Sequence, residues 1–245
     1  MYRSALLSLT LAASGVALAV EHGAHWGYDG ATGPEHWAEL DPHFALCKNG
    51  KSQTPIDLAG FVDSQLPPIG FHYRPGGSDE INNGHTIQIN YAAGSTITLD
   101  GHDYELKQFH FHTPSENHIS GKAYPMEAHL VHADAEGRLA VIAVMIEEGA
   151  ENAALTTPWS QIPTHVDEDV HLAAKASAEG LLPRDRDYYR FEGSLTTPPC
   201  TEGVTWLVMK HPVTASAGQI AKFSRVMGHP NNRPIQSLNA RVIVE

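Results

Sequence analysis

The sequence lacks several features that would mark particular classes of protein. It has 16 Lys and Arg against 28 Asp and Glu, a net charge of −12, and no basic run. Because nucleic-acid binding needs a cationic surface, this composition argues against that class. No polar tract is long enough to indicate disorder. After residue 20, no apolar run approaches the roughly 18 residues that a membrane-spanning helix needs.

The first nineteen residues contain the one extended apolar stretch. They combine Arg3, an apolar run over 5–16 and the small-x-small sequence Ala-Leu-Ala at 17–19. This pattern predicts a cleaved signal peptide over 1–19, followed by one domain over 20–245; an uncleaved N-terminal helix is the alternative. We therefore expect an exported protein, periplasmic or secreted, with no membrane anchor.

Cysteine is also scarce, with only Cys47 and Cys200. In an oxidising compartment, two lone cysteines predict one disulfide. The alternative, a nucleophilic Cys200, is weaker because its surroundings, TTPPCTE, contain no adjacent base.

Short extended runs separated by turn residues dominate the rest of the chain. Alternating or β-branched sequences predict strands at 85–91, 95–100, 105–113, 127–134, 139–147 and 201–211. The turn at 135–137 predicts a hairpin. A helix is expected over 217–228, and 170–182 could hold another short one. The expected fold is mostly β (α+β): a single domain around a large, mainly antiparallel twisted central sheet with short peripheral helices.

Histidine, by contrast, is abundant, with 16 residues. His110 and His112 lie two apart in a predicted strand, so their side chains share one face. The next predicted strand supplies His129, with Glu127 on the same face. Three neutral nitrogen donors suit Zn²⁺ and leave its fourth position for water, although a lone His-x-His can also be incidental.

The third ligand cannot be chosen from spacing alone, since His118, His129 and His132 all follow. His118 lies in a loop-like segment, and His132 falls on the strand face opposite His129. Strand parity therefore favours His129. Glu127, two residues before it, strengthens the metal interpretation, because a ligating histidine usually gives its other nitrogen to a carboxylate or carbonyl.

These residues resemble those of the α-class carbonic anhydrases, and of the exported bacterial branch in particular. The resemblance spans nearly all of 25–245. It rests on seven runs in the family's order: HWGYDG (25–30), NGKSQTPIDL (49–58), NNGHT (82–86), QFHFHTPSEN (108–117), YPMEAHLVH (124–132), GSLTTPPCTEGVTW (193–206) and NNRPIQ (231–236).

The resemblance implies zinc-dependent, reversible hydration of carbon dioxide to bicarbonate and a proton, through zinc-bound hydroxide. By position, the zinc ligands are His110, His112 and His129. Thr196 matches the gatekeeper that accepts a hydrogen bond from the hydroxide, and Glu116 the acid that takes the Thr proton.

Further roles follow from the same matches. His85 resembles the proton shuttle, an exposed turn histidine being the alternative. Gln108 and Glu127 match the hydrogen-bond partners of two ligands. The polar groups around the water chain match Tyr28, Asn83 and Gln88. The lining of the substrate pocket matches Val131, Val141, Leu195, Thr197, Val204 and Trp206. The family's disulfide matches Cys47 and Cys200.

The sequence departs from the family pattern after Glu116. Many members have His there, whereas this chain has Asn117 followed by His118. That puts in doubt a supporting hydrogen bond near Glu116 and argues against a role for His118. The N-terminal histidines are interpreted as surface or structural residues, with metal scavenging as the alternative: His22, His25, His36 and His43.

Two rival functions agree less well with the three histidines. A non-catalytic binding domain of the same fold would usually lack a ligand histidine, and all three are present. A jelly-roll oxygenase would need a carboxylate ligand. The expected partner is a small substrate, carbon dioxide or bicarbonate, and analogy with exported relatives suggests a homodimer.

Overall fold

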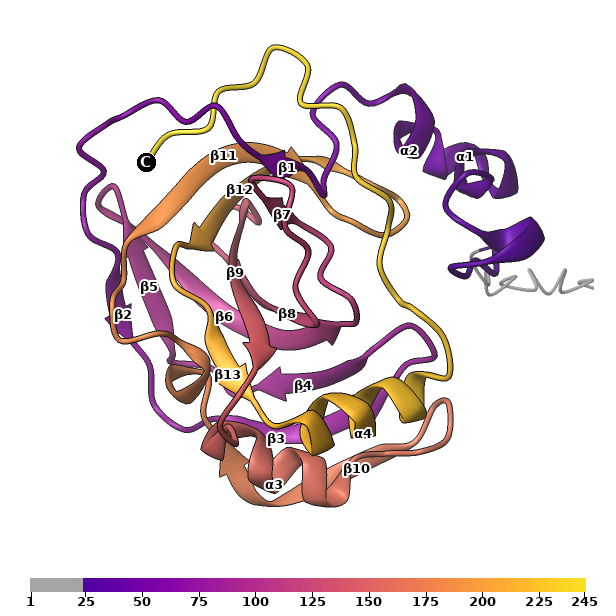
Figure 1. Cartoon of the computed structure of the whole chain (residues 1–245), viewed down its shortest axis with the longest axis vertical. Coiled ribbons are helices and arrows are strands. Elements are labelled where there is room, and N and C mark those ends of the chain that lie inside the picture. Colours follow the sequence, from indigo (N-terminus) through magenta and orange to yellow (C-terminus); the bar gives the residue numbers. More distant parts are fainter. Residues whose placement is uncertain (1–23) are drawn as a thin grey trace, which may run out of the picture.

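The computed structural model describes residues 24–245, so the predicted signal peptide over 1–19 lies outside the described residues. One large twisted sheet carries the fold (Figure 1). Its strands, with the small pair β1 and β7, are β1 (Asp57–Leu58), β2 (Gly70–His72), β3 (Gly77–Asn82), β4 (Ile87–Tyr91), β5 (Thr96–Leu99), β6 (His102–His112), β7 (His118–Ile119), β8 (Met126–Ala133), β9 (Leu139–Glu148), β10 (Asp169–Ala176), β11 (Tyr188–Ser194), β12 (Glu202–Met209) and β13 (Val213–Ala215).

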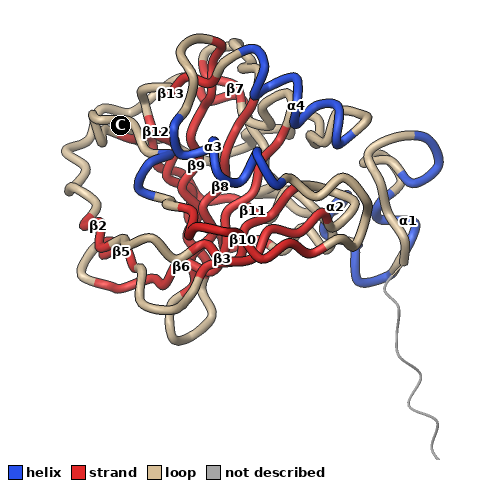
Figure 2. Tube along the Cα trace, turned by 90° about the horizontal axis from the view of Figure 1, so that it is seen from below, coloured by secondary structure: helices blue, strands red, loops and turns tan. Residues whose placement is uncertain are grey.

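The helices are few and short: α3 and α4 lie over one face of the sheet, and α1 lies to one side of it (Figure 2). They are η1 (Gly30–Thr32), α1 (Trp37–Leu40), η2 (Pro42–Phe44), α2 (Leu46–Asn49), α3 (Ala153–Gln161), η3 (Glu179–Leu181) and α4 (Ala217–Met227). Among residues 24–245, none of them has the length and apolar character needed to cross a membrane.

The order along the sheet is β10-β3-β4-β6-β8-β9-β12-β11, with β2, β5 and β13 attached beside this path. Neighbouring strands of this sheet are antiparallel except where β12 and β13 run parallel to β9; the separate pair β1 and β7 is also parallel. The expected fold class, a mainly antiparallel sheet with peripheral helices, is therefore confirmed. The hairpin of β8 and β9 is confirmed as well.

The helix predicted over 217–228 is also confirmed. Ser216 and Gln219 form a capping box at its start, and Gly228 ends it at a φ of 74°, which suits glycine. The second helix, over 170–182, is wrong: 169–176 is strand β10, and only 179–181 forms a 3-10 turn. Pairing with β3 overrides the helical preference of this alanine-rich segment.

The two faces of the sheet have different cores. Ile89, Phe109 and Leu130 lie in register across β4, β6 and β8 and belong to the larger apolar core, which α3 and α4 cover. On the other face, His110 and His129 lie directly opposite each other. That face continues into a second apolar core, which includes Val141, Val204 and Trp206.

Candidate metal centre

Three histidines converge on the second face of the sheet. His110 and His112 come from β6 and His129 from β8, and one nitrogen of each ring lies within 4.8 Å of the others. The ring centroids are 5.1 Å apart for His110 and His112, 5.3 Å for His110 and His129, and 4.6 Å for His112 and His129. The strand register therefore brings together the three histidines that the sequence singled out.

The other nitrogen of each ring is hydrogen-bonded to an oxygen that can only accept. The pairs are His110 Nδ1 with Gln108 Oε1 (2.7 Å), His112 Nδ1 with the Asn231 carbonyl (2.7 Å), and His129 Nε2 with Glu127 Oε1 (2.8 Å). The proton of each ring must sit on that nitrogen, so the lone pairs of the remaining nitrogens face one another. Within residues 24–245, the buried His112 Nε2 has no hydrogen-bond partner.

Burial also favours the neutral, ligating form of these rings. His112 and His129 are each 1% exposed. Desolvation holds the pKa of His110 and His129 well below the usual range, and it also lowers the pKa of His112. Three neutral imidazoles, an orphaned buried nitrogen and no thiolate form a donor set that fits Zn²⁺.

Glu127, which lies opposite His112 in the sheet, is the acceptor behind His129. Burial raises its pKa, whereas hydrogen bonds from Asn117 and Glu116 lower it. Asn117 is the position at which the sequence departs from the family pattern. Its side chain donates to Glu127 at 2.7 Å, so a supporting hydrogen bond does exist here, and it acts on Glu127.

Glu116 lies next to the histidines and is 1% exposed. Its Oε1 accepts a hydrogen bond from the backbone N–H of Arg233 at 2.8 Å, and its Oε2 lies 3.4 Å from His112 Nε2. Burial raises the pKa of Glu116 to about 8, against the effect of Arg233 and of the Thr196 hydroxyl. Oε2 itself has no hydrogen-bond partner among the described residues, so Thr196 is close by without a well-formed bond to it.

His85 lies between two cavities. The inner cavity, of about 130 Å³, is lined by His110, His112 and Gln108 together with Tyr28, Asn83, His85, Gln88 and Thr197. The outer cavity, of about 510 Å³, is lined by His25, Asp29, Asp167 and His229 in addition to Tyr28, Asn83 and His85. His85 is therefore the one imidazole shared by both.

The ring of His85 is held in place by its neighbours. It stacks on Trp26 with centroids 3.6 Å apart and planes 8° apart. Asn83 Oδ1 accepts hydrogen bonds from the backbone N–H groups of His85 and Thr86 at 3.0 and 2.9 Å, which fixes the turn. Burial lowers the pKa of His85, and the nearby His25 and His229 lower it further.

The predicted apolar residues gather beside His129. Trp206 meets the His129 ring edge-on at 4.9 Å, and Val141 and Val204 are each 2% exposed in the same core. Val131 and Leu195 pack against this core and are partly buried. Of the residues predicted to contact substrate, Thr197 is among those that line the inner cavity.

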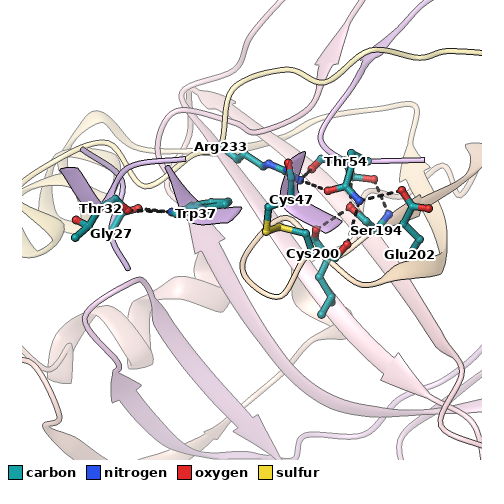
Figure 3. The surroundings of a disulfide bond; sticks show 11 residues. Gly27, Thr32, Trp37, Cys47, Thr54, Ser194, Cys200, Glu202 and Arg233 are labelled. Atoms are coloured by element: carbon teal, nitrogen blue, oxygen red, sulfur yellow. Dashed lines mark hydrogen bonds between the residues drawn. A yellow bond between two sulfur atoms is a disulfide. The ribbon is translucent and has the colours of Figure 1, made fainter. Parts of the chain in front are cut away.

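The disulfide between Cys47 and Cys200 is confirmed, with the two Cα atoms 5.0 Å apart (Figure 3). The backbone N–H of Cys200 donates to the Thr197 carbonyl at 2.8 Å. The disulfide therefore ties the loop that carries Thr196 and Thr197 to helix α2.

No separate signal in the sequence marks two residues that support the site, Asn231 and Arg233, although both lie in the run NNRPIQ. Asn231 supplies the carbonyl for His112, and its side chain donates to the Phe111 and His85 carbonyls. Arg233 is 2% exposed and donates to Gln53 and to the Thr54 and Cys47 carbonyls (Figure 3). A buried arginine in a loop has no periodic signal; only its place in the matched run could have indicated it.

The other histidines lie away from the centre. His132 is buried on the opposite face, and His118 belongs to β7, which pairs with β1. His36 and His43 are surface residues beside Glu39 and Asp41, as expected for a surface interpretation. His22 lies outside the described residues.

A mostly antiparallel sheet presents three neutral imidazoles to one point, next to an apolar wall, and this arrangement could hold one metal ion. Comparison with known proteins gives the family of the chain. The family model for eukaryotic-type carbonic anhydrase matches residues 32–245. The chain belongs to the α-class carbonic anhydrase family and is an enzyme of that family.

Individual relatives agree along nearly the whole chain. A carbonic anhydrase from Pectobacterium atrosepticum is 51% identical over 90% of either chain. One from Neisseria gonorrhoeae is 47% identical over 98% of this chain and 96% of the relative. The solved α-carbonic anhydrase from Thermovibrio ammonificans, in complex with the inhibitor sulfanilamide, superposes with a TM-score of 0.90 at 48% identity and covers 91% of this chain and 100% of that one.

Proposed function

We propose that the protein catalyses the reversible hydration of carbon dioxide to bicarbonate and a proton, with Zn²⁺ held by His110, His112 and His129. One observation carries this proposal: three ring nitrogens converge while the second nitrogen of each ring is bonded to an acceptor. Zn²⁺ bound by three neutral imidazoles lowers the pKa of a coordinated water to about 7, the value known for carbonic anhydrases as a class.

Thr196 and Glu116 would orient the attacking oxygen. Because Oε1 of Glu116 already accepts from Arg233, Oε2 is the oxygen left for Thr196. An ionised carboxylate only accepts, so the Thr196 hydroxyl must donate to Glu116 and can only accept from the attacking oxygen. Glu116 would be ionised with Zn²⁺ bound, because a nearby dication would oppose the effect of burial on its carboxyl group. The lone pair of the nucleophile is thereby directed at the substrate carbon.

The apolar wall beside His129 would bind the substrate. Carbon dioxide offers little to hydrogen-bond, so a surface of Trp206, Val141 and Val204 suits it, with Val131 and Leu195 at the edge. Thr197, which lines the inner cavity, is the polar neighbour that would contact substrate.

His85 would carry the proton out. It lines both cavities, and a depressed pKa keeps its ring neutral and able to accept a proton. Tyr28, Asn83 and Gln88 line the inner cavity between His85 and the ligands, where they could hold bridging water.

Thr196→Ala tests this proposal, with the exposed Thr156→Ala in α3 as the control. We expect the wild-type protein to contain one zinc and to hydrate carbon dioxide in a stopped-flow assay. Thr196→Ala should keep its zinc and lose about 10²-fold in kcat/KM, the order expected when one orienting hydrogen bond is removed. Loss of zinc from this variant would contradict the assigned role, and absence of activity from the zinc-loaded wild type would overturn the function.

Export is proposed on the signal-like residues 1–19 and is supported by the disulfide, since such bonds persist in oxidising compartments. The mature chain should begin at Val20 when it is sequenced from a periplasmic or secreted fraction. A mature chain that still begins at Met1 would contradict this. The expected homodimer stays a prediction, which sedimentation of the purified protein would test.

A further inference from the structure

A buried asparagine lies directly behind the ligand His129. Asn117 is 0% exposed, and its Nδ2 donates to Glu127 Oε1 at 2.7 Å. The same Oε1 accepts from His129 Nε2 at 2.8 Å. A continuous chain of hydrogen bonds therefore runs from Asn117 through one carboxylate oxygen to a metal-binding ring.

The orientation of this amide is determined by its second partner. Asn117 Oδ1 accepts from the backbone N–H of Ile56 at 3.0 Å. Because a backbone N–H can only donate, the oxygen must be the atom that faces Ile56, and the NH₂ group must face Glu127. The amide cannot turn over without leaving both contacts unsatisfied inside the protein, where each buried polar group without a partner is costly.

Asn117 also fixes the second oxygen of Glu127. Oε2 accepts from the backbone N–H groups of Asn117 and Glu116 at 2.8 and 2.7 Å. Of the three donors that Glu116 and Asn117 give to this carboxylate, two belong to Asn117. Only one direction of Oε1 remains open, and His129 fills it.

We propose that Asn117 is a positioning residue of the metal centre: it holds Glu127 at the angle that His129 needs, and so sets how long the ion is retained. This inference rests on the proposed zinc site. An amide suits the task because it always donates through the same atom, whatever the pH. The expected result of losing it is faster loss of zinc, with the three ligands still in place.

Asn117→Leu and Asn117→Asp test the proposal together. Leucine removes both ends of the amide at a similar volume. Aspartate keeps the acceptor for Ile56 and replaces the NH₂ group that faces Glu127 with a carboxyl oxygen. The primary measurement is the rate of zinc release from the loaded protein to an excess of chelator, which does not depend on turnover.

Both variants should release zinc about 10-fold faster, within the 10–100-fold range that such partners show in zinc enzymes, carbonic anhydrases among them. The His129 Nε2 proton in the NMR spectrum of the zinc-loaded protein should also shift upfield, because its acceptor is less well held. Asn152→Leu is the matched control: Asn152 is 9% exposed and caps α3, so its loss should lower stability and leave zinc release unchanged.

A double-mutant cycle isolates the route of the effect. If Asn117 acts through Glu127, Asn117→Leu should change zinc release less than about 2-fold in a Glu127→Ala background. An unchanged release rate in both single variants would overturn the inference, as would a full 10-fold effect without Glu127. A wild-type protein that binds no zinc would instead overturn the proposed function, so the two failures can be told apart.

Discussion

Strand β8 carries one buried histidine on each of its faces, and the two differ in a single respect. His129 is 1% exposed and His132 is 0% exposed. Burial lowers the pKa of both, that of His132 to about 4. Each ring has one nitrogen bonded to an acceptor, which is Glu127 for His129 and the Ala140 carbonyl for His132.

The second nitrogen distinguishes the two rings. In His132 it is bonded to the Tyr73 hydroxyl at 2.5 Å, and Tyr73 stacks on the ring with planes 12° apart. In His129 it faces the nitrogens of His110 and His112. Burial and a depressed pKa therefore do not distinguish a candidate metal ligand from a structural histidine. The distinguishing feature is a nitrogen lone pair that has no hydrogen-bond partner and that faces the lone pairs of other histidines.

Replacing His129 and His132 one at a time should have very different consequences. His129→Ala should abolish zinc binding and carbon dioxide hydration together, because two imidazoles do not form the three-ligand site. His132→Gln should keep zinc and activity and lose about 1–3 kcal/mol of unfolding free energy, because it breaks a buried hydrogen-bond pair. Metal analysis, stopped-flow assays and denaturant unfolding measure the three quantities. Zinc and activity retained in His129→Ala would show that His129 is not a zinc ligand.

His85 and His229 also differ in position: His85 lines both the inner and the outer cavity, whereas His229 lines the outer cavity. His85→Ala should slow turnover by about 10-fold in weak buffer and recover with added imidazole, because the proton then has no internal relay. His229→Ala should change turnover less. Stopped-flow rates across a buffer series check this. Equal slowing of His85→Ala at every buffer concentration would remove it as the relay.

The disulfide lies outside the sheet that carries the three histidines, so its loss should affect stability and zinc binding differently. The proposed zinc ligands belong to β6 and β8, whereas Cys47 and Cys200 join α2 to the loop after β11. Replacing both cysteines with serine should lower the unfolding free energy by about 2–5 kcal/mol and leave zinc bound. Calorimetry and metal analysis test this. An unchanged melting temperature would show that the disulfide does not stabilise the fold. Loss of zinc on mild reduction would show that zinc binding depends on it.

The buried carboxylates on the two faces of the sheet differ in their hydrogen bonding. Glu127 has a partner for each oxygen, whereas neither oxygen of Glu80 has one among the described residues. Burial raises the pKa of Glu80 to about 8, although Lys222 opposes the rise. Between about pH 4.5 and 8 the folded protein therefore holds a proton that the unfolded chain has lost. This makes the fold less stable as the pH rises through that range.

Glu80→Leu should remove this dependence. Relative to wild type, the variant should gain about 1–3 kcal/mol of unfolding free energy between pH 5 and pH 8. Urea unfolding at both pH values measures the difference. Parallel pH profiles for the two proteins would show that Glu80 does not carry the penalty.

The sequence predicted which three histidines converge because strand geometry is local. A period of two places His110 and His112 on one face, and parity separates His129 from His132. The carbonyl behind His112 could not be predicted, since it comes from Asn231, 119 positions away in a loop. The segment 170–182 was predicted wrongly for a related reason: its strand forms only through pairing with β3, which its own residues do not specify.

X-ray absorption at the zinc edge of the purified, zinc-loaded protein gives the ligand shell of the ion itself. We expect three imidazole nitrogens at about 2.0–2.1 Å and one oxygen from solvent. A shell that contains sulfur, a protein carboxylate or four imidazoles would contradict it.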